Sequence, residues 1–240
     1  GVTWSVLGAL FYAFALLSKE IAIGLPLILL WLEWSHSDGR VRRTVIYFVL
    51  VIAYVLVRLS FVQTTDPLYF SSEQMPIAVL NLVGLYVCRA LWPSNPRLLY
   101  DNFPIIEIGL YFVVGLISLI VCSYVVWVNR RTDNGAGLGA VTAMIFLAPV
   151  LHVIPLGTIA AERYLYMPIF GLGLMIAAYA QRLPIPKVIS GRGRRALIGI
   201  SCLFLMMGLG CIRSSDWSDE VSLWSAELSS QPTQFKAFAN

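Results

Sequence analysis

The chain has 240 residues, of which 58% are hydrophobic and 12% are charged, and its net charge is +4. A water-soluble domain of this size could not bury so much apolar surface, because about a quarter of an average globular chain is charged. The composition therefore indicates a polytopic membrane protein with an all-α, helical membrane domain. The positive charge lies in loop arginines rather than on one basic face, so nucleic acid is not an expected partner.

About seven apolar runs approach the ~20 residues that a helix needs to cross the hydrocarbon core. They cover residues 3–17, 21–34, 44–63, 105–128, 138–155, 164–180 and 196–212. The first two runs are short, and Ser18, Lys19 and Glu20 lie between them. We therefore expect this Lys-Glu pair to be recessed below the membrane surface.

The basic residues predict the orientation of the spans. Residues 35–43, 129–131 and 181–195 together carry ten of the 17 Lys and Arg. Because positively charged loops stay in the cytoplasm, all three segments are assigned to the inside. Lys19-Glu20 and Glu162-Arg163 then fall on the external face.

The apolar run 77–92 does not fit this topology as a full span, because the preceding span ends outside and the following one begins outside. The run is short, contains Asn81, Gly84 and Arg89, and ends at Trp92-Pro93. It predicts an interfacial or re-entrant helix.

The character of the chain changes after residue 212. Residues 215–220 supply a helix cap and an acidic first turn, and an amphipathic pattern follows until it is broken near Pro232. Two short helices with such a break predict a helical repeat. We therefore expect a membrane domain over residues 1–212 and the start of an external repeat region over 213–240. Both ends of the chain look cut, so a fragment of a longer protein is expected.

A group of charged residues on the external face could hold the phosphate of a lipid. The candidates are Lys19, Glu20, Arg58, Arg89, Glu162 and Arg163. The alternative is that these residues only anchor helix ends and neutralise one another. No metal or cofactor is expected, because the cysteines and histidines lack ligand spacing, and His152 is expected to be a hydrogen-bonded helix residue.

Several stretches carry a family resemblance. They are A-L-L-S-K-E (15–20), L-W-P-S-N-P-R-L-L-Y-D (91–101), P-L-G-T-I-A-A-E-R-Y-L-Y-M-P (155–168), D-W-S-D-E-V-S-L-W (216–224) and P-T-Q-F-K-A-F-A-N (232–240). Together they resemble the transmembrane and tetratricopeptide-repeat (TMTC) proteins and their bacterial relatives. That family belongs to the GT-C glycosyltransferases, near the protein O-mannosyltransferases.

The resemblance implies transfer of a sugar, mannose or another hexose, from a polyprenyl-phosphate donor to Ser or Thr of an acceptor protein on the external face. It implies that Lys19 and Arg163 hold the donor phosphate and that Glu20 and Glu162 position them or the sugar. Tyr164 is a further donor-site candidate, because its ring could stack on a sugar; the alternative is an aromatic belt at the membrane interface. The expected location is the bacterial inner membrane with a periplasmic C-terminus, or the endoplasmic reticulum membrane with a lumenal one.

The catalytic residue is not assigned. In GT-C enzymes an acidic residue of the first external loop acts as base, and that loop is expected upstream of Gly1, so the fragment alone is expected to be inactive. Substitution by Asp101 or Glu107 is not expected. The main alternative is a non-catalytic membrane scaffold whose external repeats bind proteins. A lipid-linked oligosaccharide ligase or transporter is disfavoured, because the external segment carries only Arg89 and Arg97.

Overall fold

The structure is a computed structural model that describes residues 2–35, 44–61, 71–92, 100, 103–131, 135–152, 159–181, 218–219, 221–222 and 225. Every regular element within these ranges is a helix, which confirms the predicted all-α class for the described part. The chain divides into two compact units, Gly1–Ala180 and Gln181–Asn240. The predicted span 196–212 lies outside the described residues, as does nearly all of the predicted repeat start.

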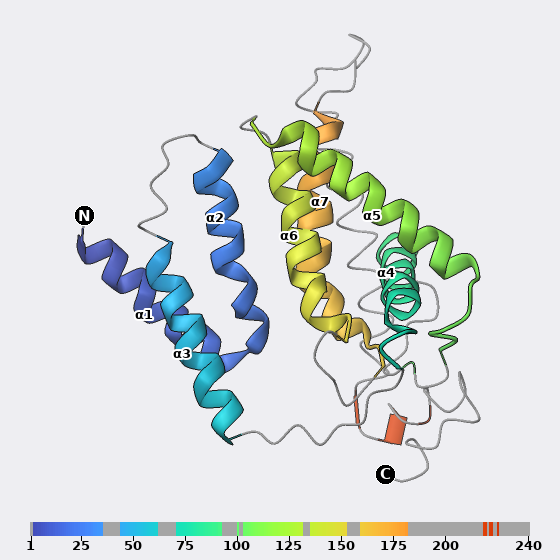
Figure 1. The fold of residues 1–240 in the computed structure, drawn as a ribbon, viewed down its shortest axis with the longest axis horizontal. Helices are drawn as coiled ribbons and strands as arrows, with labels where there is room; N and C mark the ends of the chain where they lie inside the picture. The colour runs from blue at the N-terminus through green and yellow to red at the C-terminus, as the bar shows by residue number, and fades with distance from the viewer. Residues whose placement is uncertain are drawn as a thin grey trace. The chain divides into compact units, whose positions relative to one another are not determined.

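The first unit contains seven α-helices and three described 3₁₀ turns (Figure 1). In chain order they are α1 (Val2–Ser18), η1 (Glu20–Gly24), α2 (Leu25–Ser35), α3 (Val45–Phe61), α4 (Met75–Leu91), α5 (Leu110–Asn129), α6 (Gly135–Leu147), η3 (Ala148–Val150), η4 (Glu162–Leu165) and α7 (Tyr166–Ala180). Six of them fall on the predicted spans, and α4 falls on the run predicted to be interfacial or re-entrant.

Two elements differ in extent from the predicted spans. Helix α5 begins at Leu110 rather than at Ile105, because extended Gly109 caps it and residues 103–107 form turns before it. Helix α6 tightens into η3 at Pro149, whose ring cannot continue an α-helix without distortion. By length and hydropathy, Leu110–Asn129 and Glu162–Ala180 are long enough to cross a membrane, whereas the other described apolar helices have 10–17 residues.

Glycines allow two helix pairs to pack backbone against backbone. A Cβ on Gly84 of α4 would overlap the Tyr111 carbonyl of α5, and one on Gly115 of α5 would overlap the Leu80 carbonyl of α4. Likewise, a Cβ on Gly139 of α6 would lie 2.5 Å from the Gly171 carbonyl oxygen of α7. Small residues at helix contacts are typical of membrane helix pairs, where close van der Waals packing replaces the hydrophobic effect.

Contacts along α6 show that α2 and α7 both run antiparallel to it. Near the end of α6, a Cβ on Gly24 would lie 2.8 Å from the Ile145 side chain. Near its start, a Cβ on Gly137 would lie 3.3 Å from Trp31 of α2 and 3.1 Å from Asn129 of α5, and one on Gly135 would lie 3.7 Å from Ala178 of α7. The C-terminal ends of α2, α5 and α7 therefore meet at the N-terminal end of α6. These are the three helix ends that precede the basic segments of the sequence.

The middle of α4 is buried on every side. The six consecutive residues from Asn81 to Tyr86 are all buried, and four of them belong to the larger hydrophobic cluster of the described residues, namely Leu82, Val83, Leu85 and Tyr86. The middle of α4 is therefore an interior helix of the described part, and its interfacial or re-entrant position stays a prediction.

Asn81 connects α4 to the segment that leads into α5. Its amide nitrogen donates to the backbone carbonyls of Ile105 and Glu107, both at 2.9 Å, and the side chain is 1% exposed. Replacing Asn81 by Leu keeps the size but leaves two carbonyls without a donor. Each buried acceptor left unsatisfied costs about 1–3 kcal/mol, so we expect the Asn81→Leu variant to lose about 2–4 kcal/mol of stability.

Thermal unfolding of the purified protein in a mild detergent measures this loss. A loss of that size corresponds to a fall in midpoint of roughly 4–16 °C for a chain of this length. Ser60→Ala is the control, because Ser60 bonds only the Leu56 carbonyl of its own helix and is exposed. If Asn81→Leu unfolds at the same temperature as the control, the interpretation of this contact is wrong.

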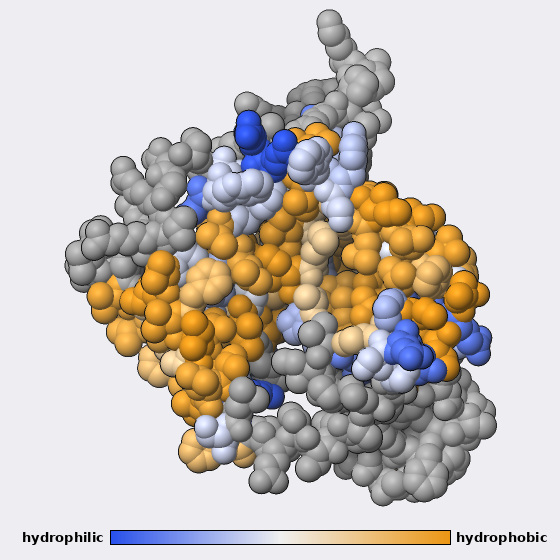
Figure 2. Space-filling view, viewed as in Figure 1, coloured by the Kyte–Doolittle hydropathy of each residue, from blue (hydrophilic) through white to orange (hydrophobic). Residues whose placement is uncertain are grey.

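The outer faces of several helices are apolar. Among the exposed side chains, Phe14 on α1 is 65% exposed, Leu56 on α3 is 61% exposed, and Ile120 on α5 is 60% exposed. Figure 2 shows hydrophobic side chains over the visible faces of these helices, with hydrophilic ones gathered toward helix ends. Contiguous exposed apolar surface of this extent marks a surface that contacts other apolar material.

In the second unit, the described residues contain a helix cap. The Asp219 carboxylate accepts a hydrogen bond from the Ser222 backbone N–H at 2.7 Å and one from the Ser222 hydroxyl at 2.8 Å. The bond from the backbone N–H is the main reason that the pKa of Asp219 is lowered. A cap was predicted in residues 215–220, and Asp219 provides it.

Candidate functional site

Two charged turns lie at the same end of α6. We call residues 19–24 the first charged turn and residues 161–165 the second charged turn. The first contacts the end of α6 through Gly24, which faces Ile145 and Phe146. The second leads directly into α7, which runs antiparallel to α6. The sequence predicted that both turns lie on one face of the membrane domain, and the packing around α6 brings them to one end.

The two turns have the same local structure. Lys19 and Ala161 are extended, with φ and ψ of −154° and 125° and of −152° and 141°. A glutamate, Glu20 or Glu162, then opens a 3₁₀ turn that continues into an apolar helix. In each case a buried proline, Pro26 or Pro168, follows six residues after the glutamate. The chain thus builds the same charged entrance to a helix twice.

Hydrogen bonds hold the extended segment before the second charged turn. The His152 ring nitrogen Nε2 lies 2.6 Å from the Ile159 carbonyl oxygen, and the Tyr100 backbone N–H donates to the Ala160 carbonyl at 3.2 Å. His152 is 1% exposed, so the prediction that it is hydrogen-bonded is confirmed. The prediction that it is helical is wrong, because it lies in a turn after η3 with φ of 59°, in the left-handed region.

The second charged turn has a defined hydrogen-bond and ring environment. The Tyr100 hydroxyl donates to Glu162 Oε1 at 2.7 Å. The Arg89 guanidinium carbon lies 5.4 Å from the centre of the Tyr100 ring, and that of Arg163 lies 5.3 Å from the centre of the Tyr164 ring. Both arginines are within cation–π range of their rings. The Tyr100 ring thus connects the Arg89 guanidinium to the Glu162 carboxylate, while Arg163 packs on Tyr164.

Tyr86 of α4 adds a polar group beneath the same turn. Its side chain is 2% exposed, and its buried hydroxyl lies close to the Ala161 backbone of the second charged turn. Arg163 and Tyr164 lie close enough to act on it electrostatically. The contact with Ala161 joins α4 to the second charged turn.

The structure groups four of the seven predicted donor-site residues. Arg89, Glu162, Arg163 and Tyr164 lie together where α4 contacts η4. Lys19 is exposed in the first charged turn, with Glu20 after it. Arg58 is exposed on α3, which packs on α1, and donates from Nη1 to the Tyr54 hydroxyl at 2.9 Å.

Two residues of this site, Tyr100 and Tyr86, were missed in the sequence. Tyr100 lies within a stretch that carries the family resemblance, but a single tyrosine among apolar residues gives no sign that it reaches Glu162, 62 positions away. Tyr86 lies in an apolar run without any distinguishing pattern. Asp101 and Arg97 lie outside the described residues, and Glu107 is exposed, with its backbone carbonyl bound by Asn81.

The described residues contain no group of three or more His, Cys, Asp or Glu side chains that could hold a metal ion. Comparison with known proteins adds no assignment, because no family model, no curated protein and no solved structure matches the chain.

Proposed function

We propose that the chain forms the donor-binding side of a polytopic membrane glycosyltransferase of the GT-C class. The proposed reaction moves a hexose from a polyprenyl-phosphate donor to Ser or Thr of an acceptor protein on the external face. The observation that carries the proposal is the position of the two charged turns, which lie at one end of α6 with Lys19 and Arg163 both exposed.

The distribution of charge along the bundle supports the membrane orientation in this proposal. The ends of α2, α5 and α7 meet at the opposite end of α6 from the charged turns, and each precedes a basic segment. Basic segments at one end agree with the positive-inside rule, which assigns that end to the cytoplasm. The charged turns then belong to the external end, and the apolar outer faces of α1, α3 and α5 contact lipid.

The groups at the second charged turn suit a lipid phosphate and its sugar. Arginine forms paired, charge-assisted hydrogen bonds with phosphate oxygens, and Arg163 is exposed and so able to reach a ligand. The Glu162 carboxylate accepts a hydrogen bond from the Tyr100 hydroxyl at 2.7 Å, which fixes its orientation at the turn. In an inverting displacement these cations would stabilise the departing lipid phosphate, while a carboxylate outside the described residues removes the acceptor proton.

Sugar transfer by the full-length protein in membranes tests the proposal. Membranes are supplied with radiolabelled polyprenyl-phosphate hexose, and label in acceptor protein is counted for the native protein and for Lys19→Ala. We expect Lys19→Ala to lose at least tenfold in transfer at equal expression, because it removes one of two exposed cations at the site. Arg131→Ala is the control, since Arg131 is also an exposed arginine but follows α5 at the other end.

The same experiment separates the enzyme from the scaffold. A scaffold transfers no label with any donor, and its external region still captures partner proteins after the Lys19→Ala change. That pair of results would replace the proposed function. If Lys19→Ala and the native protein transfer label equally, the proposed enzymatic function stands, but the first charged turn is not part of the donor site.

A further inference from the structure

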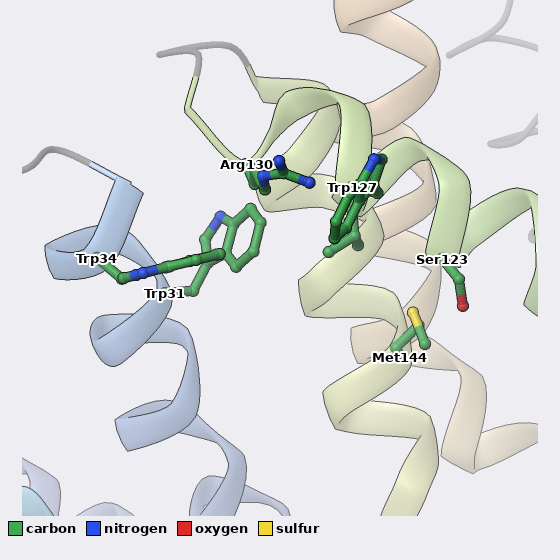
Figure 3. Close-up of a pocket in the computed structure, with 7 residues that line it drawn as sticks. Trp31, Trp34, Ser123, Trp127, Arg130 and Met144 are labelled. Carbon is green, nitrogen blue, oxygen red and sulfur yellow. The ribbon is translucent and has the colours of Figure 1, made fainter.

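An apolar crevice opens between α2, α5 and α6, and it extends from Arg130, near the N-terminal end of α6, to Met144 in the last turn of that helix (Figure 3). It has a volume of about 280 Å³. Its walls are formed by Trp31, Trp34, Ser123, Val126, Trp127, Arg130 and Met144. Typical small-molecule sites measure about 300–1,000 Å³, so this crevice suits part of an apolar chain rather than a whole compact ligand.

Tryptophans build the walls of the crevice in a fixed arrangement. The rings of Trp31 and Trp34 meet edge to face with centres 5.3 Å apart. Trp31 also faces Gly137 of α6, where a Cβ would come within 3.3 Å of its ring. Trp127 closes the other side from α5 and is 64% exposed. Tryptophan is enriched at the level of lipid headgroups, where one side of the ring is apolar and the other is wet.

One arginine brings a positive charge into this apolar setting. The Arg130 guanidinium carbon lies 3.5 Å from the centre of the Trp127 ring, and Figure 3 shows the side chain directed between Trp127 and the α2 tryptophans. Its Nη1 atom is buried and has no hydrogen-bond partner. Stacking on the indole holds the guanidinium in place but gives its Nη1 atom no hydrogen-bond acceptor, which an anion could supply.

We infer that this crevice binds an anionic phospholipid, with an acyl chain between the tryptophans and the phosphate on Arg130. The inference rests on the membrane orientation of the proposed function, because Arg130 lies at the end that carries the basic segments. Basic pockets between membrane helices on the cytoplasmic side suit anionic headgroups. A free phosphate would use only the Arg130 contact and leave the apolar walls uncovered.

Among the described residues, Glu33 of α2 is a carboxylate to test as an alternative partner of Arg130. It lies next to Trp34 on α2, and its Oε2 is also buried without a hydrogen-bond partner. If Glu33 paired with Arg130, either substitution would leave one buried charge without a partner. Glu33→Gln and Arg130→Gln would then lower the unfolding temperature alike. If the crevice binds an anionic lipid, Glu33→Gln removes a repulsion and leaves binding equal or tighter.

Lipid binding to the purified full-length protein tests the inference. Delipidated protein in a neutral detergent is titrated with dioleoyl phosphatidylglycerol, with dioleoyl phosphatidylcholine and with inorganic phosphate, and bound lipid is counted by native mass spectrometry. We expect one saturable phosphatidylglycerol site that Arg130→Gln weakens at least tenfold and that Arg131→Gln leaves unchanged. Phosphatidylcholine should bind at least tenfold more weakly, and inorganic phosphate should show no saturable binding.

Several results would overturn the inference. Equal weakening of phosphatidylglycerol binding by Arg130→Gln and Arg131→Gln would indicate diffuse attraction to the basic end. Equal binding of the two lipids, binding of inorganic phosphate alone, or loss of lipid binding in Glu33→Gln would also contradict the inference. Thermal unfolding of each variant without lipid checks that the variants fold. If lipid binding is not found, the proposed sugar transfer is unaffected. If the protein is recovered in the soluble fraction, the membrane orientation on which both proposals depend is wrong.

Discussion

Gly84→Ala is expected to disrupt the packing of α4 on α5. A Cβ at this position would overlap the Tyr111 backbone carbonyl, and the reciprocal contact of Gly115 with the Leu80 carbonyl leaves neither helix room to withdraw. Overpacking a close contact costs about 1–3 kcal/mol and more where the obstacle is backbone rather than a flexible side chain. Because α4 contributes Tyr86 and its neighbours to the hydrophobic core, we expect the variant to be less stable and the second charged turn to be displaced.

The matched control for this prediction is Gly173→Ala. Gly173 is also helical, but a Cβ there would meet nothing within 4 Å. Alanine stabilises a helix interior relative to glycine by about 0.5–1 kcal/mol, so this variant should unfold at the native temperature or slightly above it. Thermal unfolding in detergent, read by size-exclusion chromatography after heating, compares the two. Equal midpoints for Gly84→Ala and Gly173→Ala would contradict the helix contact described here.

Arg163→Ala is expected to reduce sugar transfer at least hundredfold in the full-length protein. Removing one preorganised donor from a developing negative charge costs about 10²–10³ in rate in other enzymes, and Arg163 is proposed to face the departing phosphate. Its side chain is exposed and stands beside the Tyr164 ring, so its loss should leave the fold intact. Label transferred from polyprenyl-phosphate hexose, at equal protein expression, gives the rate.

Arg163→Lys distinguishes charge from geometry at this position. Lysine keeps the positive charge but cannot form the paired hydrogen bonds of a guanidinium, so it should recover transfer only in part. Full activity in Arg163→Ala would exclude Arg163 from the donor site. Equal loss in Arg163→Ala and Arg163→Lys with normal unfolding would indicate that recognition by the planar guanidinium, and not charge alone, is required.

The helices were predictable because local information defines them. Apolar runs bounded by Pro, Gly or charged residues, such as the one that ends at Lys19-Glu20, became helices close to the predicted limits. Pro149 could be read in the sequence, but it did not predict where α6 ends, because proline is tolerated near helix ends. The shape of the charged turns was not predicted, because a 3₁₀ turn depends on backbone geometry that composition does not reveal.

The contacts that assemble the candidate site were less accessible from the sequence. The charge pattern identified Glu162, Arg163 and Arg89, since charged residues beside apolar runs are conspicuous. The bond from Tyr100 to Glu162 and the approach of Gly84 to Tyr111 join residues far apart in sequence, and no local pattern specifies such pairs. The crevice around Arg130 was likewise missed, because Trp31 and Trp127 meet only after α2 and α5 pack on α6.

Retention of radiolabelled polyprenyl phosphate by the purified full-length protein tests the central claim most directly, because it measures donor binding without the chemistry. The native protein is compared with Lys19→Ala/Arg163→Ala and with Arg131→Ala/Arg182→Ala, which removes the same charge from the predicted cytoplasmic end. We expect the native and control proteins to retain the lipid equally and the Lys19→Ala/Arg163→Ala protein to retain at least tenfold less. Equal retention by all three proteins would contradict the assignment of the two charged turns to a donor-phosphate site.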